Sequence, residues 1–289
     1  MQIKESELIL NPDGSIYHLN LKPGDIANTI LTVGDPERVD QVTAHFDTIE
    51  NVAESREFRT KTGIYKGMRL TVISTGIGTD NIDIVLNELD ALVNIDFKTR
   101  QVKNALTSLR IIRIGTTGCI QSDIPVDKFV VSERAIGFDN LLHFYKKTAS
   151  FDTDFSEALK EFTQWNSKNS DPYVVSGDPE LVTLFTSEEC VKGITSTNSG
   201  FYGPQGRILR LALHDDTLNS KLEQFRYKGK SITNLEMETA GIYGLSHLLG
   251  HKAISLSVIL ANRANGTFSK NPKAAVENLI QYTLERLVS

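Results

Sequence analysis

The sequence predicts an α/β domain, and two observations carry that prediction. Short runs rich in Ile and Val, each the length of a buried strand, alternate with longer segments whose apolar residues recur at helical spacing. No internal repeat, low-complexity tract or long Pro/Gly/Ser-rich linker divides the 289 residues. We therefore expect one domain over residues 1–289, with residues 1–14 as a loose N-terminal segment.

The expected strands are apolar runs bounded by polar or turn-forming residues. They cover 29–33, 69–74, 110–114, 128–132, 191–196, 207–213 and 253–261. The expected helices carry their apolar residues on one stripe. They cover 36–46, 81–93, 217–227, 236–249 and 272–287.

Composition limits the classes of function. The chain is 40% hydrophobic and 23% charged with a formal net charge of −5, so it can bury a sizeable core and has no basic block that predicts nucleic-acid or membrane binding. No apolar run approaches the ~20 residues that cross a bilayer, and the N-terminus lacks a signal-peptide pattern, which predicts a cytoplasmic protein. Cys119 and Cys190 are expected to be buried thiols. The histidines show no metal-ligand spacing, so we expect neither a metal nor a cofactor.

Two stretches are candidate anion-binding sites. In VGDPERV, residues 33–39, Asp35 suits a helix N-cap and Pro36 the first helical position, so free backbone N–H groups and Arg38 would face an anion. The alternative is a well-capped helix with a surface arginine. In RIGTTG, residues 113–118, two glycines and two threonines after a strand can curl into an anion-binding concavity.

Arg113 lies inside the strongest strand signal, where a buried guanidinium needs a partner. No acid lies within six residues on either side of it. Its counter-ion is therefore either a remote carboxylate or an oxyanion of a ligand, and the spacing leaves both open.

The loop SGFYGPQGR, residues 199–207, is a candidate for binding a planar heterocycle. Gln205 supplies an amide and Arg207 a charged donor fork, which together suit an edge with carbonyl and N–H groups. Phe201 offers a face on which a ring can stack. The alternative is a solvated glycine-rich loop.

Two carboxylates flank a methionine in NLEMETAG, residues 234–241. By spacing alone, Glu236 and Glu238 resemble a general acid/base pair. Two positions apart on a helix, however, they would point to different sides and could not flank one bond.

Two motifs of other nucleotide-binding folds are incomplete. Gly229-Lys230-Ser231 lacks the first glycine of a P-loop. Gly76-Ile77-Gly78 follows a strand, but Asn81 stands where a dinucleotide fingerprint has its third glycine. A dinucleotide-dependent dehydrogenase is therefore disfavoured.

Together the motifs resemble those of one family. GDPERV, SREF (55–58), STGIG (74–78), RIGTTG, FYGPQGR and NLEMETAG occur in the order and approximate spacing seen in uridine-type members of the nucleoside phosphorylase family. The resemblance runs from about residue 15 to the C-terminus. It implies a three-layer α/β/α sandwich with a central mixed sheet, and cleavage of a nucleoside's glycosidic bond by inorganic phosphate.

The resemblance implies roles for individual positions. Phosphate would contact Gly34, Arg38, Arg113, Thr116 and, from the neighbouring subunit, Arg56. Ribose would contact Thr116, Met237, Glu238 and, across the same interface, His18. The base would contact Thr117, Gly118, Phe201, Gln205 and Arg207. Arg113, Arg207 and Glu238 would serve catalysis, while Glu236 and Arg263 would support the site.

Three positions refine what the resemblance implies. Asn262-Arg263 matches uridine-type members, whereas purine-specific relatives carry an aspartate there, so uridine and phosphate are the expected substrates. The segment 91–109 is an insertion relative to compact bacterial members and favours a homodimer over a hexamer. Asn81 stands where a serine helps to bind a monovalent cation in some members, so that cation site is not expected here.

Other functions remain open at this point. A purine nucleoside phosphorylase or a hydrolytic nucleosidase would share the fold. A catalytically silent nucleoside-binding or scaffold protein is the alternative from a different class, because a fold alone does not determine function.

Overall fold

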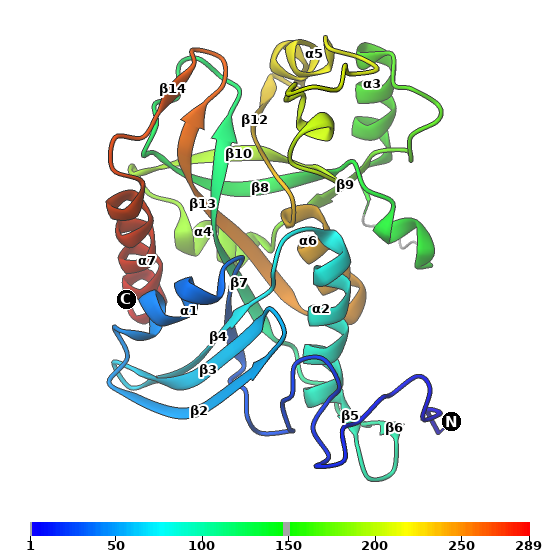
Figure 1. Cartoon of the computed structure of the whole chain (residues 1–289), viewed down its shortest axis with the longest axis vertical. Coiled ribbons are helices and arrows are strands. Elements are labelled where there is room, and N and C mark those ends of the chain that lie inside the picture. Colours follow the sequence, from blue (N-terminus) through cyan, green and yellow to red (C-terminus); the bar gives the residue numbers. More distant parts are fainter. Residues whose placement is uncertain (1, 147–150) are drawn as a thin grey trace.

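A computed structural model describes residues 2–146 and 151–289 of the chain. Its main feature is a mixed sheet in the order β11-β12-β10-β8-β13-β7-β1-β4-β3-β2, with β9 paired to β8 and β14 to β13 (Figure 1). The strands of this sheet are β1 Thr29–Val33, β2 Thr48–Ser55, β3 Phe58–Tyr65, β4 Met68–Ser74, β7 Arg110–Cys119, β8 Phe129–Gly137, β9 Tyr173–Ser176, β10 Cys190–Thr197, β11 Arg226–Tyr227, β12 Lys230–Glu236, β13 Lys252–Asn262 and β14 Thr267–Phe268. A separate hairpin consists of β5 (Ile95–Asp96) and β6 (Gln101–Val102).

Part of the sheet closes on itself. Antiparallel pairing of Asn234 with Cys119 and of Leu235 with Gly118 joins the end of β12 to the end of β7. Because β7, β13, β8, β10 and β12 are already neighbours in the sheet, this pairing closes them into a ring. β1 lies parallel between β4 and β7, and β1 and β4 end side by side next to the middle of β7, where Arg113 pairs with Thr32.

Helices cover both faces of the sheet. Helix α2 packs against α6 on one side, while α4 and α7 pack together on the other, next to α1 (Figure 1). The side chain of His45, just after α1, meets Glu277 of α7 at 2.8 Å. The helices are α1 Pro36–Thr43, α2 Thr79–Asn94, α3 Thr153–Thr163, α4 Pro179–Phe185, α5 Leu218–Gln224, α6 Thr239–Leu249 and α7 Pro272–Val288, with 3-10 turns η1 Leu141–Phe144 and η2 Gly203–Gln205. The predicted fold class, α/β with a mixed sheet flanked by helices, is confirmed.

One expected strand is absent from its predicted place. Residues 207–213 form a loop in which Ile208, Leu209 and Leu211 are 57%, 79% and 76% exposed. The run is apolar enough for a buried strand, but β10, which precedes it, is already paired on both sides, with β8 and β12. This run therefore cannot pair with the strand that precedes it.

Other expectations need smaller corrections. The helix expected at 236–249 begins at Thr239, because the preceding residues belong to β12. The strand expected at 110–114 continues to Cys119, so RIGTTG is extended strand rather than a curled loop. Cys119 is buried as predicted, whereas Cys190 is only half-buried, and both are free thiols. Within the described ranges, none of the helices has both the length and the apolar character needed to span a membrane.

The N-terminal segment is packed rather than loose. Leu8 is buried, and the backbone N–H of Ile3 donates to the carbonyl of Arg100 at 2.8 Å. The Arg100 guanidinium donates in return to the carbonyls of Ile3 at 3.0 Å, Lys4 at 3.1 Å and Leu8. Arg100, in the β5–β6 hairpin of the 91–109 insertion, therefore holds residues 3–8 by hydrogen bonds to their backbone.

Candidate active site

A buried arginine with two carboxylates forms the centre of the candidate site. Arg113 projects from β7, and its Nη2 donates to Oε2 of Glu238 at 2.5 Å and lies 3.4 Å from Oε2 of Glu236. Its Nη1 donates to the hydroxyl of Ser257 on β13 at 3.3 Å. The counter-ions that the sequence left open are thus remote carboxylates, which the β12–β7 pairing brings alongside.

Glu236 is the last residue of β12, and its carboxylate accepts backbone N–H groups at the start of α6. Its carboxylate accepts the N–H of Glu238 at 2.9 Å and of Thr239 at 3.0 Å, and the hydroxyl of Thr197 at 2.6 Å. These donors include the first free N–H groups of α6, whose positive end favours a carboxylate. The Glu236 carboxylate is therefore engaged by donors of the protein itself.

Glu238 occupies the N-cap position of α6 and is buried. Its Oε1 accepts the N–H of Gly78 at 2.9 Å, while Oε2 accepts Arg113. The expectation that Glu236 and Glu238 point to different sides of one helix is wrong, because a strand ends between them and both approach Arg113.

The electrostatics of this cluster reflect its burial. Burial raises the pKa of the Glu238 carboxyl; Arg113 opposes this effect and the charge of Glu236 adds to it. Burial alone would lower the pKa of Arg113, but the two carboxylates outweigh it and the pKa is raised. The two carboxylates thus favour the charged form of Arg113, whereas burial favours the neutral form of Glu238.

A second arginine lies at the same edge of the sheet. Asp35 caps α1 by accepting the N–H of Glu37 at 2.8 Å, as the sequence predicts, and Arg38 follows in the first turn. Burial lowers the pKa of Arg38, and the charge of Arg113 lowers it further. The Nε of Arg38 is buried without a hydrogen-bond partner among the described residues. An unsatisfied guanidinium at a helix N-terminus is a favourable place for an anion.

Gly34 and Thr116 complete this edge. Gly34 ends the turn after β1, where a Cβ would lie 3.6 Å from the carbonyl of Gly76 after β4. Thr116 is half-buried in β7. The structure therefore brings Gly34 and Arg38, which follow β1, close to the stretch of β7 that carries Arg113 and Thr116.

The loop 199–207, which the sequence predicts to bind the base and which is called the base loop below, is held together by its own arginine. Arg207 lies over the ring of Phe201, 3.7 Å from its centroid, and donates to the Phe201 carbonyl at 2.6 Å and to Oε1 of Gln205 at 2.5 Å. Gln205 is buried, whereas Phe201 is 51% exposed. Arg207 thus covers one face of Phe201, and a base that stacks there must use the other face or displace the guanidinium.

Arg263 holds this loop by hydrogen bonds to its backbone. Its guanidinium donates to the carbonyls of Gln205 and, at 3.4 Å, Gly206. Its stem packs over Gly118, where a Cβ would lie 3.6 Å from Cδ of Arg263. Burial lowers the pKa of Arg207, and the charge of Arg263 lowers it further, so the two guanidinium groups act on one another.

Thr117 has a structural contact that the sequence did not suggest. Its hydroxyl is buried, donates to the carbonyl of Leu235 at 2.8 Å and accepts from Asn234 Nδ2 at 2.9 Å. These bonds fasten β7 to β12. The Thr117 hydroxyl is therefore already engaged, and only the backbone of this position is left to meet a base.

His18 and Arg56 lie together, apart from the central cluster. Arg56 sits on the β2–β3 turn at φ 55 and lies 5.6 Å from the ring centroid of Tyr17. Tyr17 packs edge-on against His18, whose Nδ1 is 2.6 Å from Oε1 of Glu88. Among the described residues, neither His18 nor Arg56 makes a hydrogen bond or ion pair with Arg38, Arg113 or Glu238.

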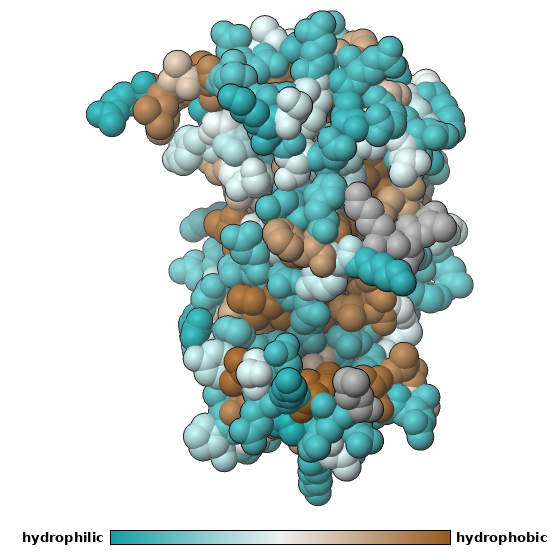
Figure 2. Space-filling view, turned by 90° about the vertical axis from the view of Figure 1, so that its right-hand side faces the viewer, coloured by the Kyte–Doolittle hydropathy of each residue, from teal (hydrophilic) through white to brown (hydrophobic). Residues whose placement is uncertain are grey.

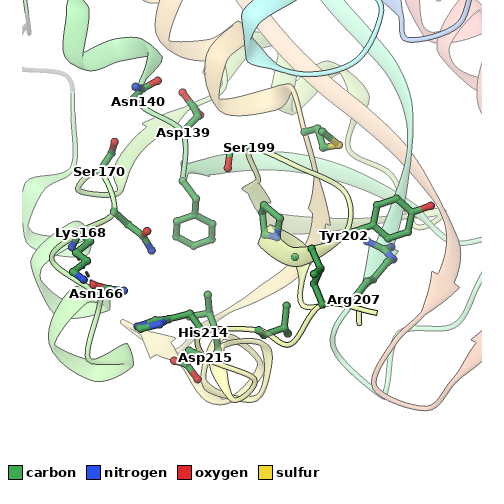
Figure 3. Close-up of a pocket in the computed structure, with 18 of the residues that line it drawn as sticks. Asp139, Asn140, Asn166, Lys168, Ser170, Ser199, Tyr202, Arg207, His214 and Asp215 are labelled. Carbon is green, nitrogen blue, oxygen red and sulfur yellow. Dashed lines mark hydrogen bonds between the residues drawn. The ribbon is translucent and has the colours of Figure 1, made fainter. Parts of the chain in front are cut away.

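A large cavity adjoins the central cluster and the base loop. Its volume is about 1060 Å³, and Gly78, Met237, Ser199, Tyr202 and Arg207 line the part nearest the cluster. Figure 3 shows Asp139, Asn140 and Ser199 on one wall and His214 and Asp215 on the opposite wall, with Asn166, Lys168 and Ser170 between them. Most of these residues escaped sequence reasoning, because they come from separate loops without a shared motif.

Asp139 is the buried acid of that wall. Its carboxylate accepts the hydroxyl of Tyr173 at 2.7 Å and the N–H of Leu141 at 2.8 Å. Burial raises the pKa of Asp139, and these two hydrogen bonds oppose the rise. A lone Asp before an apolar turn carries no signal that distinguishes it from a surface residue.

The fold and the arginine–carboxylate site define a class of protein that binds an anion beside a polar organic ligand. The family model described as the Phosphorylase superfamily matches residues 28–289, and the chain belongs to that family. A uridine phosphorylase of Thermococcus kodakarensis is 30% identical over 89% of this chain and 81% of its own length. A DeoD-type purine nucleoside phosphorylase of Shewanella denitrificans is 27% identical over 94% and 98%.

A solved structure resembles the chain over almost its whole length. A Trypanosoma brucei nucleoside phosphorylase, whose crystal structure is described as showing uridine phosphorylase activity, superimposes with a TM-score of 0.88. It is 31% identical, and the match covers 98% of this chain and 99% of that one.

Proposed function

We propose that the protein catalyses the reversible phosphorolysis of uridine to uracil and ribose 1-phosphate in pyrimidine salvage, as a pentosyltransferase. This proposal rests on the Arg113–Glu238 pair. The pair lies near Arg38, in the first turn of α1, and near the cavity that Met237 lines. An anion site and a diol acceptor therefore sit side by side. The similarity to the Trypanosoma brucei and Thermococcus kodakarensis proteins supports uridine as the nucleoside.

Each group of side chains has a task in this reaction. Arg38, Arg113, Gly34 and Thr116 bind phosphate, while Glu238 accepts hydrogen bonds from the ribose hydroxyls above Met237. The transition state resembles an oxocarbenium ion, with phosphate approaching C1′ and negative charge moving onto the base. Alignment of phosphate with C1′, and stabilisation of the leaving uracil by Gln205 and Arg207, supply the catalysis without a covalent nucleophile.

The preference for a pyrimidine rests on the end of β13. Asn262 is buried and its side-chain amide donates to the carbonyls of Gln121 and Ile124, both at 2.8 Å. Arg263 then braces the base loop. No carboxylic acid stands at these two positions to protonate a purine ring nitrogen.

The protein acts as a homodimer with shared active sites in this proposal. Arg56 and His18 lie outside the central cluster of their own chain, which suits residues that serve a neighbour's site. Tyr17, Ile77 and Phe144 are 40%, 69% and 81% exposed. Figure 2 shows apolar patches on the face that carries η1 and α2. Sedimentation velocity should give a dimer, and a monomer at assay concentration would contradict the shared site.

We also propose that inorganic phosphate is a co-substrate and that no metal or organic cofactor takes part. In this proposal Arg38 and Arg113, together with Arg56 of the neighbouring subunit, supply the positive charge that phosphate requires. Activity in phosphate buffer should survive exhaustive dialysis against a chelator; loss restored by a divalent cation would count against this point.

The deciding experiment compares three nucleosides with and without phosphate. Uridine should be consumed only when phosphate is present, with ribose 1-phosphate formed in equal amount to uracil. Consumption of uridine without phosphate would indicate a nucleosidase. Preferential cleavage of inosine or methylthioadenosine would favour a purine phosphorylase, the second candidate, to which the Shewanella denitrificans relative belongs.

A further inference from the structure

Glu88 makes an unusual number of contacts with one short turn of the N-terminal segment. Its Oε1 meets the Nδ1 of His18 at 2.6 Å, and its Oε2 accepts the N–H of His18 at 3.1 Å and of Leu19 at 2.9 Å. Glu88 lies on α2, between Leu86 and Leu89, both fully buried in the core. A carboxylate fixed to a rigid helix therefore holds both the backbone and the ring of His18.

These contacts determine which ring nitrogen of His18 is free. A carboxylate only accepts hydrogen bonds, so the Nδ1 of His18 carries a proton in this contact. In the neutral ring the proton is then absent from Nε2, which becomes a hydrogen-bond acceptor. The His18 side chain is 25% exposed, so the ring is partly open to solvent.

The rest of the segment is held at both sides of the turn. Upstream, the Arg100 guanidinium binds the carbonyls of Ile3, Lys4 and Leu8. Ile16, Leu19 and Leu21 are buried in the core around the turn. His18 therefore belongs to an ordered segment that packs on the core and not to a free terminus. Its contacts with Glu88 orient the imidazole ring.

We propose that Glu88 is a positioning residue for the reaction: it holds His18 in the tautomer whose Nε2 accepts a hydrogen bond from the ribose 5′-hydroxyl. This inference rests on the proposed function, in which His18 reaches the nucleoside bound by the neighbouring subunit. Glu88 itself touches no substrate.

The test is the Glu88→Gln variant with uridine and with 5′-deoxyuridine, which lacks the hydroxyl. An amide offers one acceptor and one donor, so it cannot satisfy the His18 ring and both backbone N–H groups as the carboxylate does. We expect kcat/KM for uridine to fall about tenfold, as for other orienting partners of a histidine. The value for 5′-deoxyuridine should change less than about twofold. Glu88→Gln should add nothing further for uridine in a His18→Ala background.

Asp83→Asn is the matched control, because it converts an acid to an amide on the same helix. Asp83 bonds Tyr145 and Asn87 rather than the 17–19 turn, so both substrates should react with it as with the wild type. Equal losses for uridine and 5′-deoxyuridine in Glu88→Gln would mean that Glu88 only supports the fold, and no loss for either would mean that it does not orient His18. Either result overturns the inference.

A measurement on the wild type keeps the inference testable if Glu88→Gln does not fold. An NMR spectrum that correlates the ring protons with ¹⁵N reports the tautomer of His18, whose signals are identified by their loss in His18→Ala. In the neutral ring, these signals should show a protonated Nδ1 and an unprotonated Nε2. The opposite tautomer would refute the proposal. If the wild type does not consume uridine with phosphate at all, the proposed function has failed instead, which is a distinct outcome.

Discussion

Replacing Glu238 by alanine tests whether the Arg113 cluster has the energetics that its geometry implies. Removing one partner of a buried ion pair typically costs about 3–5 kcal/mol, because the other charge stays buried without compensation. Two features place this variant at the lower end. Glu236 remains 3.4 Å from the same nitrogen of Arg113. Gly78, whose N–H loses its acceptor, lines the cavity and can be reached by water. We expect the free energy of unfolding to fall by about 3 kcal/mol.

Urea unfolding followed by tryptophan fluorescence measures this change. The only tryptophan in the sequence, Trp165, stacks on Phe138 at a centroid distance of 4.9 Å and reports loss of the cavity wall. Glu180→Ala is the control, since Glu180 is an exposed partner of Lys252 and its loss should cost less than about 1 kcal/mol. A Glu238→Ala variant as stable as the Glu180→Ala control would refute the reasoning.

The same residue predicts a change in substrate preference. Glu238→Gln keeps the shape of the side chain but replaces one acceptor oxygen by a donor, so one ribose hydroxyl loses its acceptor. Relative to the wild type, kcat/KM should fall more for uridine than for 2′-deoxyuridine, because the latter has no 2′-hydroxyl to lose. Equal losses for the two nucleosides would remove Glu238 from the recognition of the diol.

Three further outcomes follow from the site. Arg207→Ala should lower kcat for uridine by about 10²–10³, the usual cost of a donor that stabilises developing negative charge; near-normal turnover would exclude that role. Arg56→Ala should raise the KM for phosphate with a smaller effect on the KM for uridine, as steady-state kinetics can test. Burial raises the pKa of Asp139 in the folded protein, so the native state binds more protons than the unfolded state as the pH rises above the ordinary Asp pKa of about 3.9. The free energy of unfolding of the wild type should fall as the pH rises from the ordinary Asp pKa to the raised pKa of Asp139, and it should fall less in Asp139→Asn. Unfolding measured from pH 4 to 7 would show this difference.

Local signals explain what sequence reasoning predicted well. The start of α1 follows from Asp35 and Pro36, whose preferences act within one turn of helix. The buried stripe of α2 is likewise a property of neighbouring residues. Arg113 could be recognised as a buried cation needing a partner, but the partner lies 125 positions away in sequence and meets it through a strand pairing that no local pattern encodes.

The errors also have a common physical origin. At 236–249 the helical pattern extends back over Glu236, which is the last residue of β12, and over the two residues that precede α6, so it predicts the helix too early. At 207–213 the apolar pattern of a strand is present, but the neighbouring positions in the sheet are already occupied. In both cases the tertiary pairing of β10 and β12 overrode the local preference.

The charges around Arg113 explain why the proposed site needs a second chain. Arg38 and Arg113 carry positive charges and Glu236 and Glu238 negative ones, so together these four side chains have no net charge before phosphate binds. Glu236 is satisfied by backbone N–H groups and Thr197, which moderates its repulsion of an anion. A phosphate dianion still requires positive charge that these side chains do not supply.

Arg56 is well placed to supply it from a neighbour. It is exposed on the β2–β3 turn and lies against Tyr17, which in turn contacts His18. In a two-fold dimer, contacts across the interface are reciprocal, so an Arg56 that enters the neighbour's site is matched by the neighbour's Arg56 entering this one. Under the proposed function, the expected phosphate ligand Arg56 and the expected ribose ligand His18 thus lie together through Tyr17, and the Glu88–His18 contact orders the same region.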